Sequence, residues 1–199
     1  MSPIAYDRET ALVVVDVQND FADPNGGIYV TGGEEVVPII NDAIAAARSA
    51  GGHVVYTADW HPASTPHFAK DGGVWPVHCV GDTWGAEFHP NLILDGPVVR
   101  KGTSGEDGYS GFSMKDPEGD EVTPTGLAGQ LERWGITKVV VCGLATDYCV
   151  LATVLDGIGA GFEVTLLEDA VRSVDLEPGD GKRAIDKMAQ AGCAFSTTN

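Results

Sequence analysis

The sequence predicts an α/β protein with three layers, in which a six-stranded parallel sheet lies between two layers of helices. Two observations predict this fold class. Short, wholly apolar runs, which are typical of strands buried on both faces, alternate along the chain with segments of helical periodicity. No linker or low-complexity stretch interrupts this alternation, so we expect residues 1–199 to form one domain.

Each expected strand is a short run rich in apolar residues. Residues 11–15 are apolar throughout, and the run from Lys138 to Cys142 has the same character. Because helical segments separate these runs, right-handed crossovers would join parallel strands and place helices on both faces of the sheet. The six expected strands are residues 11–15, 53–57, 96–99, 138–142, 163–167 and 194–196.

The expected helices follow from apolar spacing and from residues that favour helix ends. The segment 34–50 has apolar side chains at helical spacing and stops before Gly51. Thr123 followed by Pro124 is typical of an N-cap with proline in the first helical position. The four expected helices are residues 34–50, 123–134, 146–158 and 181–191.

Composition excludes several classes of partner. A net charge of -17 and a pI near 4.4 argue against binding to nucleic acid or to an anionic membrane, since both need a basic face. No apolar run has the length of a membrane span, and the N-terminus lacks the features of a signal peptide. Without such a signal the cysteines are expected to be reduced, and the protein cytoplasmic. The expected partner is a small-molecule substrate. Whether the protein also forms a homo-oligomer stays open.

One carboxylate and three imidazoles lie within twenty residues and predict a metal site: Asp59, His61, His67 and His78. The whole chain has five histidines. Asp59 and His61 are two positions apart where a strand ends, so both side chains point the same way. Such a set suits one divalent transition metal ion (zinc, iron or manganese) better than calcium. The alternative, surface histidines beside a turn aspartate, is disfavoured by this clustering.

Three further residues are expected at one edge of the sheet, because parallel sheets carry their sites at the carboxyl ends of their strands. Asp16 ends the first strand, Lys101 follows the third, and Cys149 begins the helix after the fourth. A helix N-terminus and a nearby ammonium lower the pKa of a thiol. Asp16 could accept the thiol proton, and the turn at residues 143–145 could offer N–H groups to an oxyanion. Taken alone, each of these three residues would more often have a structural role. The presence of all three at one edge of the sheet favours a catalytic role.

The segments that carry these residues resemble the isochorismatase-like cysteine hydrolases, and the metal set narrows the resemblance to the nicotinamidase (pyrazinamidase) branch. The resemblance covers about residues 10–195 and implies a strand order of 3-2-1-4-5-6. The segments are Val13–Phe21, Asp59–His61 with His67, Trp75–Cys79, Arg100–Gly102 and Gly143–Val150.

The resemblance implies a metal-dependent amidohydrolase that converts nicotinamide to nicotinic acid and ammonia in NAD salvage, and that also accepts pyrazinamide. Cys149 would attack the carboxamide and form a thioester, with Asp16 as general acid and base. Lys101 would stabilise the thiolate and orient Asp16. The metal would bind the pyridine nitrogen of the substrate.

The resemblance also implies how the substrate is held. A cis peptide bond would precede Ala145, and the N–H groups of Ala145 and Cys149 would form the oxyanion hole. Phe21, Trp75 and Tyr109 would line an aromatic pocket. The remaining histidines and cysteines are expected to be structural: His53, His89, Cys79, Cys142 and Cys193. Two alternatives stay open, namely another amidohydrolase of this fold, acting on an N-carbamoyl amine or on biuret, and a non-catalytic binding protein.

Overall fold

A parallel sheet forms the centre of the molecule in the computed structural model, which describes residues 4–117, 119 and 121–198. Its strands follow the order β3-β2-β1-β6-β7-β8, and every neighbouring pair is parallel. This confirms the expected order 3-2-1-4-5-6, because β6, β7 and β8 are the fourth to sixth strands of this sheet. The strands are β1 (Thr10–Val15), β2 (His53–Asp59), β3 (Val98–Lys101), β6 (Lys138–Leu144), β7 (Glu163–Arg172) and β8 (Ala194–Ser196).

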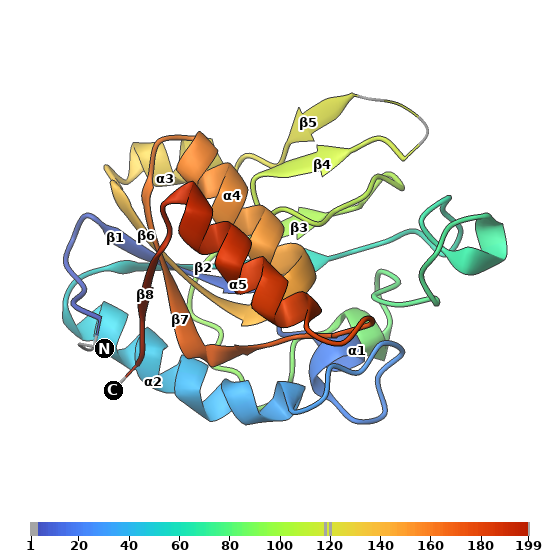
Figure 1. The fold of residues 1–199 in the computed structure, drawn as a ribbon, viewed down its shortest axis with the longest axis horizontal. Coiled ribbons are helices and arrows are strands. Elements are labelled where there is room, and N and C mark those ends of the chain that lie inside the picture. Colours follow the sequence, from blue (N-terminus) through green and yellow to red (C-terminus); the bar gives the residue numbers. More distant parts are fainter. Residues whose placement is uncertain (1–3, 118, 120, 199) are drawn as a thin grey trace.

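Helices cover both faces of the sheet and complete the three expected layers (Figure 1). One face carries α2 (Val36–Ser49), and the other carries α3 (Leu127–Arg133), α4 (Leu151–Gly159) and α5 (Asp180–Ala191). A short helix, α1 (Asn19–Ala22), follows β1. The short 3-10 segments are Gly33–Glu35, Ala69–Asp71 and Trp84–Ala86. In the described part of the chain, no helix is both long and apolar enough to cross a membrane.

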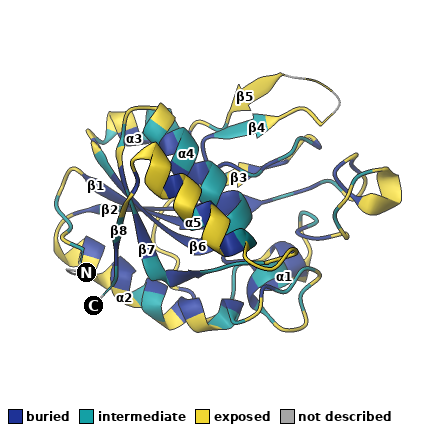
Figure 2. Cartoon of the chain, viewed as in Figure 1, coloured by how far each residue is buried: buried dark blue, intermediate teal, exposed yellow. Residues whose placement is uncertain are grey.

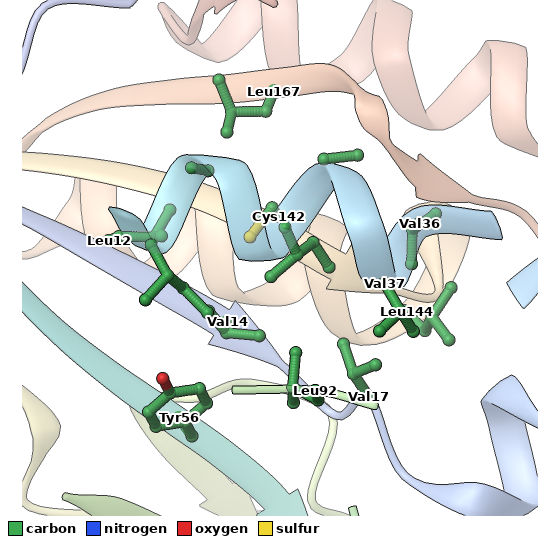
Figure 3. Packing of buried hydrophobic residues seen from close by; sticks show 14 of the residues in the cluster. Leu12, Val14, Val17, Val36, Val37, Tyr56, Leu92, Cys142, Leu144 and Leu167 are labelled. Atoms are coloured by element: carbon green, nitrogen blue, oxygen red, sulfur yellow. The ribbon is translucent and has the colours of Figure 1, made fainter. Parts of the chain in front are cut away.

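The side chains of β1 alternate between two hydrophobic cores, which explains why residues 11–15 of this strand are apolar throughout. Leu12 and Val14 pack on the α2 side with Ile40, whereas Val13 packs on the opposite side with Leu131 of α3. Figure 3 shows α2 lying over Leu12, Val14, Cys142 and Leu167. Burying each such aliphatic side chain contributes about 1.5–3 kcal/mol.

The burial of residues follows the three-layer arrangement, with the most buried residues in the central sheet. In Figure 2 the central strands are dark blue, while the outer faces of α2 and α5 are yellow. The helices therefore turn one apolar stripe toward the sheet, as amphipathic helices do. The core lies between sheet and helices and leaves the carboxyl edge of the sheet available for polar side chains.

The expected helix over residues 123–134 is wrong at its start. Val122–Pro124 forms the short strand β5, which pairs antiparallel with β4 (Ser113–Lys115). Thr123 pairs with Met114 in this hairpin, so it cannot cap a helix. The hydroxyl of Thr125 instead accepts a hydrogen bond from the N–H of Leu127, where α3 begins. The Thr-Pro signal depends only on neighbouring residues, whereas the strand pairing of Thr123 depends on Met114, nine residues earlier in the chain.

Other boundaries shift by a few residues. The strand expected at 96–99 begins at Val98 and continues to Lys101, and the strand expected at 163–167 continues to Arg172. The helix expected at 146–158 begins with a π-helical turn, Thr146–Val150, before α4. These shifts leave the expected topology unchanged.

Candidate active site

The parallel strands bring two of the residues expected at the sheet edge, Asp16 and Lys101, together with Asp59. Asp16 follows the last residue of β1, and Lys101 is the last residue of β3. Asp59, the last residue of β2, pairs in register with Lys101. All three side chains are buried. Parallel strands end at the same edge, so their last residues converge on one point.

Lys101 is the centre of this cluster. Its Nζ lies 2.7 Å from Oδ2 of Asp16, donates hydrogen bonds to Oδ1 of Asp59 and to the carbonyl of Gly108, and lies 3.6 Å from Sγ of Cys149. Burial by itself would lower the pKa of Lys101, but the carboxylates of Asp16 and Asp59 raise this pKa well above its usual value. The ammonium therefore stays charged and holds both carboxylates in place.

Asp16 has the environment of a general base. Its backbone is in the left-handed region, with φ of 47°, which is uncommon for a residue other than glycine and is often found at functional sites. Its Oδ1 accepts a hydrogen bond of 2.6 Å from the hydroxyl of Thr57. Burial raises the pKa of Asp16 to about 6, with Lys101 opposing the shift and Asp59 adding to it. A pKa in this range suits a group that takes up and releases a proton near neutral pH.

Cys149 lies in the π-helical turn that precedes α4, and its thiol faces the cluster. One ligand atom from each of Asp16, Asp59 and Cys149 lies within 4.8 Å of the others. Burial raises the pKa of the Cys149 thiol well above its usual value; Lys101 opposes this, and the two carboxylates add to it. The Lys101 ammonium lowers the pKa of this thiol as expected, but the effect of burial is larger, so the net shift is upward. The resting group is a thiol, so attack requires transfer of its proton.

The peptide bond between Leu144 and Ala145 is cis, as the resemblance implied. It lies between β6 and the turn of Cys149, and Ala145 and Cys149 both line the same pocket. Position 143, near the end of β6, requires glycine. Its φ is 114°, and a Cβ atom there would lie 2.1 Å from the carbonyl oxygen of Val15. Close approach of β1 and β6 thus brings Asp16 and the Cys149 turn together.

The three expected histidine ligands form a buried group. Nitrogen atoms of His61, His67 and His78 lie within 4.8 Å of one another. Nδ1 of His67 forms a 2.6 Å hydrogen bond with Asp107, and Nδ1 of His78 forms a 2.8 Å hydrogen bond with the carbonyl of Pro76. These bonds leave Nε2 of each ring as the nitrogen available to a metal.

His61 gives the clearest sign that a cation fits here. Both of its ring nitrogens are buried and have no hydrogen-bond partner among the described residues. An unpartnered buried polar group costs about 1–3 kcal/mol, so such groups usually serve a purpose. Oδ2 of Asp59 lies 3.7 Å from Nε2 of His61 and 3.8 Å from Nε2 of His78. Asp59 thus lies beside two of the three grouped imidazoles, and a donor set of one carboxylate and three imidazoles suits a divalent transition metal ion.

The pKa shifts of His67, His78 and Asp59 also favour the charge states that bind a metal ion. Burial lowers the pKa of His78 to about 4, although Asp59 opposes the shift. Burial likewise lowers the pKa of His67, with Asp107 opposing it. Burial would raise the pKa of Asp59, but Lys101 and the neighbouring imidazoles hold it well below its usual value. Neutral imidazoles and an ionised carboxylate are the forms that bind metals.

A cavity lined mainly by aromatic and apolar side chains opens onto both groups. Phe21, Trp75 and Tyr109 line it, as the resemblance implied. Nε1 of Trp75 donates a 2.8 Å hydrogen bond to the hydroxyl of Tyr109. Cys149 lies in one wall, and His67, His78 and Asp59 lie in the same lining.

Several lining and supporting residues were not found from the sequence. Ile28, Tyr148 and Val174 also line the cavity, and the ring of Tyr148 meets Trp75 edge-on at 4.8 Å between centroids. Gln18 accepts a hydrogen bond from the backbone N–H of Asp59 and donates one to its carbonyl, at 2.8 and 2.7 Å. Because Tyr148 directly precedes Cys149 in the sequence, it could have been predicted to lie near the site.

The residues expected to be structural lie outside this group. His53 stacks on Trp134 with 4.5 Å between ring centroids. Nδ1 of His89 accepts a hydrogen bond from the backbone of Asn91. All four cysteines are free thiols, as expected, and Cys142 belongs to the core beneath α2.

Comparison with known proteins agrees with this arrangement. Residues 10–199 match the isochorismatase domain. The chain belongs to the isochorismatase family. It is 34% identical over 206 residues to a nicotinamidase of Escherichia coli, with 94% of each chain covered. A nicotinamidase/pyrazinamidase of Mycobacterium tuberculosis is 38% identical over 172 residues, which cover 84% of this chain and 88% of the relative.

A solved structure from the family carries a metal. The pyrazinamidase of Pyrococcus horikoshii in complex with zinc is 40% identical and superposes with a TM-score of 0.84, covering 95% of this chain and 99% of that one. This relative's zinc accords with the buried group of His61, His67 and His78.

Proposed function

We propose that this protein is a metal-dependent nicotinamidase that hydrolyses nicotinamide to nicotinic acid and ammonia, and that also acts on pyrazinamide. One observation carries the proposal: Cys149, beside Asp16 and Lys101, lines the same aromatic cavity as the histidine group. The nicotinamidases and pyrazinamidases among its relatives support this activity. The product would be a pyridine carboxylate, and the expected role of the enzyme is in NAD salvage.

The substrate ring would lie among Phe21, Trp75 and Tyr109, with its carboxamide toward Cys149. The ring nitrogen would face the opposite side of the cavity, where the ligand set would hold the ion. The ligands are Asp59, His61, His67 and His78. When bound, zinc, iron or manganese would supply a Lewis-acid contact for that nitrogen.

The first half-reaction begins with a thiol. Sγ of Cys149 attacks the carboxamide carbon while its proton passes to Asp16, which is ionised beforehand. Lys101 stays protonated and stabilises the charge that develops on sulfur. The N–H groups of Ala145 and Cys149 would bind the oxyanion, and each such donor accelerates acyl transfer by about 100- to 1,000-fold. The tetrahedral intermediate then collapses, the C–N bond breaks, and the proton on Asp16 passes to the departing ammonia.

The second half-reaction repeats these roles, with water in place of the thiol as the nucleophile. Water attacks the carbonyl carbon of the thioester as Asp16 accepts one of its protons. The C–S bond breaks, the Cys149 sulfur regains a proton from Asp16, and nicotinic acid leaves, releasing its carboxyl proton to water. Asp16 thus serves as base and acid twice in each cycle, which a pKa of about 6 allows.

An ammonia-release assay tests the proposal against the other amidohydrolases of this fold. Nicotinamide and pyrazinamide should release ammonia, whereas biuret and an N-carbamoyl amine should not, since neither has a pyridine-like nitrogen to place at the metal. Hydrolysis of biuret or the carbamoyl amine in preference to nicotinamide would contradict the assignment. No hydrolysis of any of them would favour a non-catalytic binding protein.

A further inference from the structure

Three consecutive residues connect the histidine group, the catalytic cluster and the aromatic cavity. Asp107 forms a 2.6 Å hydrogen bond with Nδ1 of His67. The carbonyl of Gly108 accepts a hydrogen bond from Nζ of Lys101. The hydroxyl of Tyr109 accepts one from Nε1 of Trp75. A short segment after β3 therefore contacts each of the three parts of the site.

Asp107 is itself held by backbone bonds. Its N–H donates to the carbonyl of Lys115 at 2.7 Å, and the N–H of Lys115 donates back to its carbonyl at 3.0 Å. Lys115 is the last residue of β4, so the β4–β5 hairpin fixes the backbone from which the Asp107 carboxylate projects. The side chain is only 27% exposed. The carboxylate is thus fixed in place before any ligand binds.

His67 needs such support more than the ligands at the sheet edge. Asp59 ends β2 and His61 follows it closely, whereas His67 lies on the irregular loop beyond them. A carboxylate that accepts the Nδ1 hydrogen fixes the tautomer, turns Nε2 toward the site and makes that nitrogen more basic. For His78 the carbonyl of Pro76 makes the corresponding contact.

We propose that Asp107 is the positioning residue that sets how tightly the metal site holds its ion, an inference that rests on the metal site of the proposed function. Asp107 does not touch the ion; it acts through His67. Outer partners of metal-bound histidines typically change metal affinity by about 10- to 100-fold when removed.

The test measures metal affinity directly. Metal-free wild type, Asp107→Ala and Asp107→Asn are titrated with cobalt(II), followed by its visible absorption, and with zinc(II) in competition with a chelator. The matched control is Glu106→Gln, which removes the same charge one residue away. The Glu106 carboxylate accepts a hydrogen bond from the backbone N–H of Ser104 in its own loop. Asp107→Ala should weaken binding of both ions about 10- to 100-fold. Asp107→Asn should lie between it and wild type, because an amide oxygen can still accept from Nδ1.

Glu106→Gln should bind both ions as wild type does. Wild-type affinity in both Asp107 variants would overturn the inference, as would an equal loss in Glu106→Gln, which would indicate a general charge effect. If Asp107→Ala fails to fold, the nearly isosteric Asp107→Asn carries the measurement. A wild-type protein with no affinity for either ion would instead contradict the metal site of the proposed function and the inference with it.

Discussion

Asp59 and Lys101 are partners across β2 and β3, and their side chains form a buried ion pair at the end of both strands. The second carboxylate oxygen of Asp59 faces His61 and His78 at 3.7 and 3.8 Å. One carboxylate thus contacts Lys101 with one oxygen and lies beside two residues of the histidine group with the other. The two groups remain separable, because the thiol of Cys149 is close to Lys101 rather than to the histidines.

Removing the metal should separate substrate binding from thiol chemistry. A chelator, or His61→Ala, should weaken nicotinamide binding strongly, since the ring nitrogen loses its anchor. Cys149 should still react with iodoacetamide at a rate near that of the untreated enzyme, because Asp16 and Lys101 are unchanged. Calorimetric titration with nicotinamide and mass-spectrometric alkylation rates measure the two effects. Undiminished affinity for nicotinamide without metal would refute the anchoring role.

Activity should fall in mild acid. The pKa of Asp16 is raised to about 6, chiefly by burial, and the reaction needs its ionised form as the base. As pH falls through about 6, Asp16 becomes protonated and kcat/KM should decline, approaching a tenfold loss per pH unit. A pH profile of kcat/KM with nicotinamide checks this. A profile that stays flat from about pH 8 to 5 would show that Asp16 is not the base.

Asp147 should influence substrate affinity without touching the substrate. Its carboxylate accepts hydrogen bonds from the N–H groups of Val174 and Asp175, at 3.0 and 2.8 Å, and Val174 lines the cavity. Asp147→Ala should release this loop and raise KM for nicotinamide about fivefold, which corresponds to about 1 kcal/mol, the typical net contribution of a hydrogen bond. Steady-state kinetics distinguish this from a catalytic role, which would lower kcat and leave KM unchanged.

The core beneath α2 should dominate stability. Leu12 of β1 is fully buried there, so Leu12→Ala should lower the free energy of unfolding by about 2–5 kcal/mol. Leu176 is 62% exposed, and Leu176→Ala serves as the matched control with little expected change. Urea denaturation measures both. Equal effects of the two substitutions would contradict the packing described for α2.

The sequence was informative where a signal lies within one segment. An apolar strand followed by Asp16 or Lys101 places that residue at the carboxyl edge, because parallel strands end together. The spacing of Asp59 and His61 and the nearby histidines pointed to one group, which the structure brings together. The strand order came from resemblance to a family rather than from any local pattern.

The parts that could not be predicted depend on contacts between distant segments. Thr123 carried a helix-cap signal, but pairing with Met114 made it a strand residue. Asp107 forms a hydrogen bond with His67 from forty positions away in the chain, and no sequence pattern near either residue predicts this contact. The raised pKa of Cys149 depends on its burial and on carboxylates from two other strands, which the sequence of its own turn does not contain.

The most direct measurement of the central claim is nicotinamide hydrolysis by Cys149→Ala, with metal content determined on the same sample. Cys193→Ala is the matched control, because Cys193 lies in the core near α5 and not in the cavity. Cys149→Ala should bind the metal as wild type does and lose at least about a thousandfold in kcat, since no other group can form the thioester. Cys193→Ala should keep most of its activity. Turnover by Cys149→Ala at an appreciable fraction of the wild-type rate would contradict the thioester mechanism.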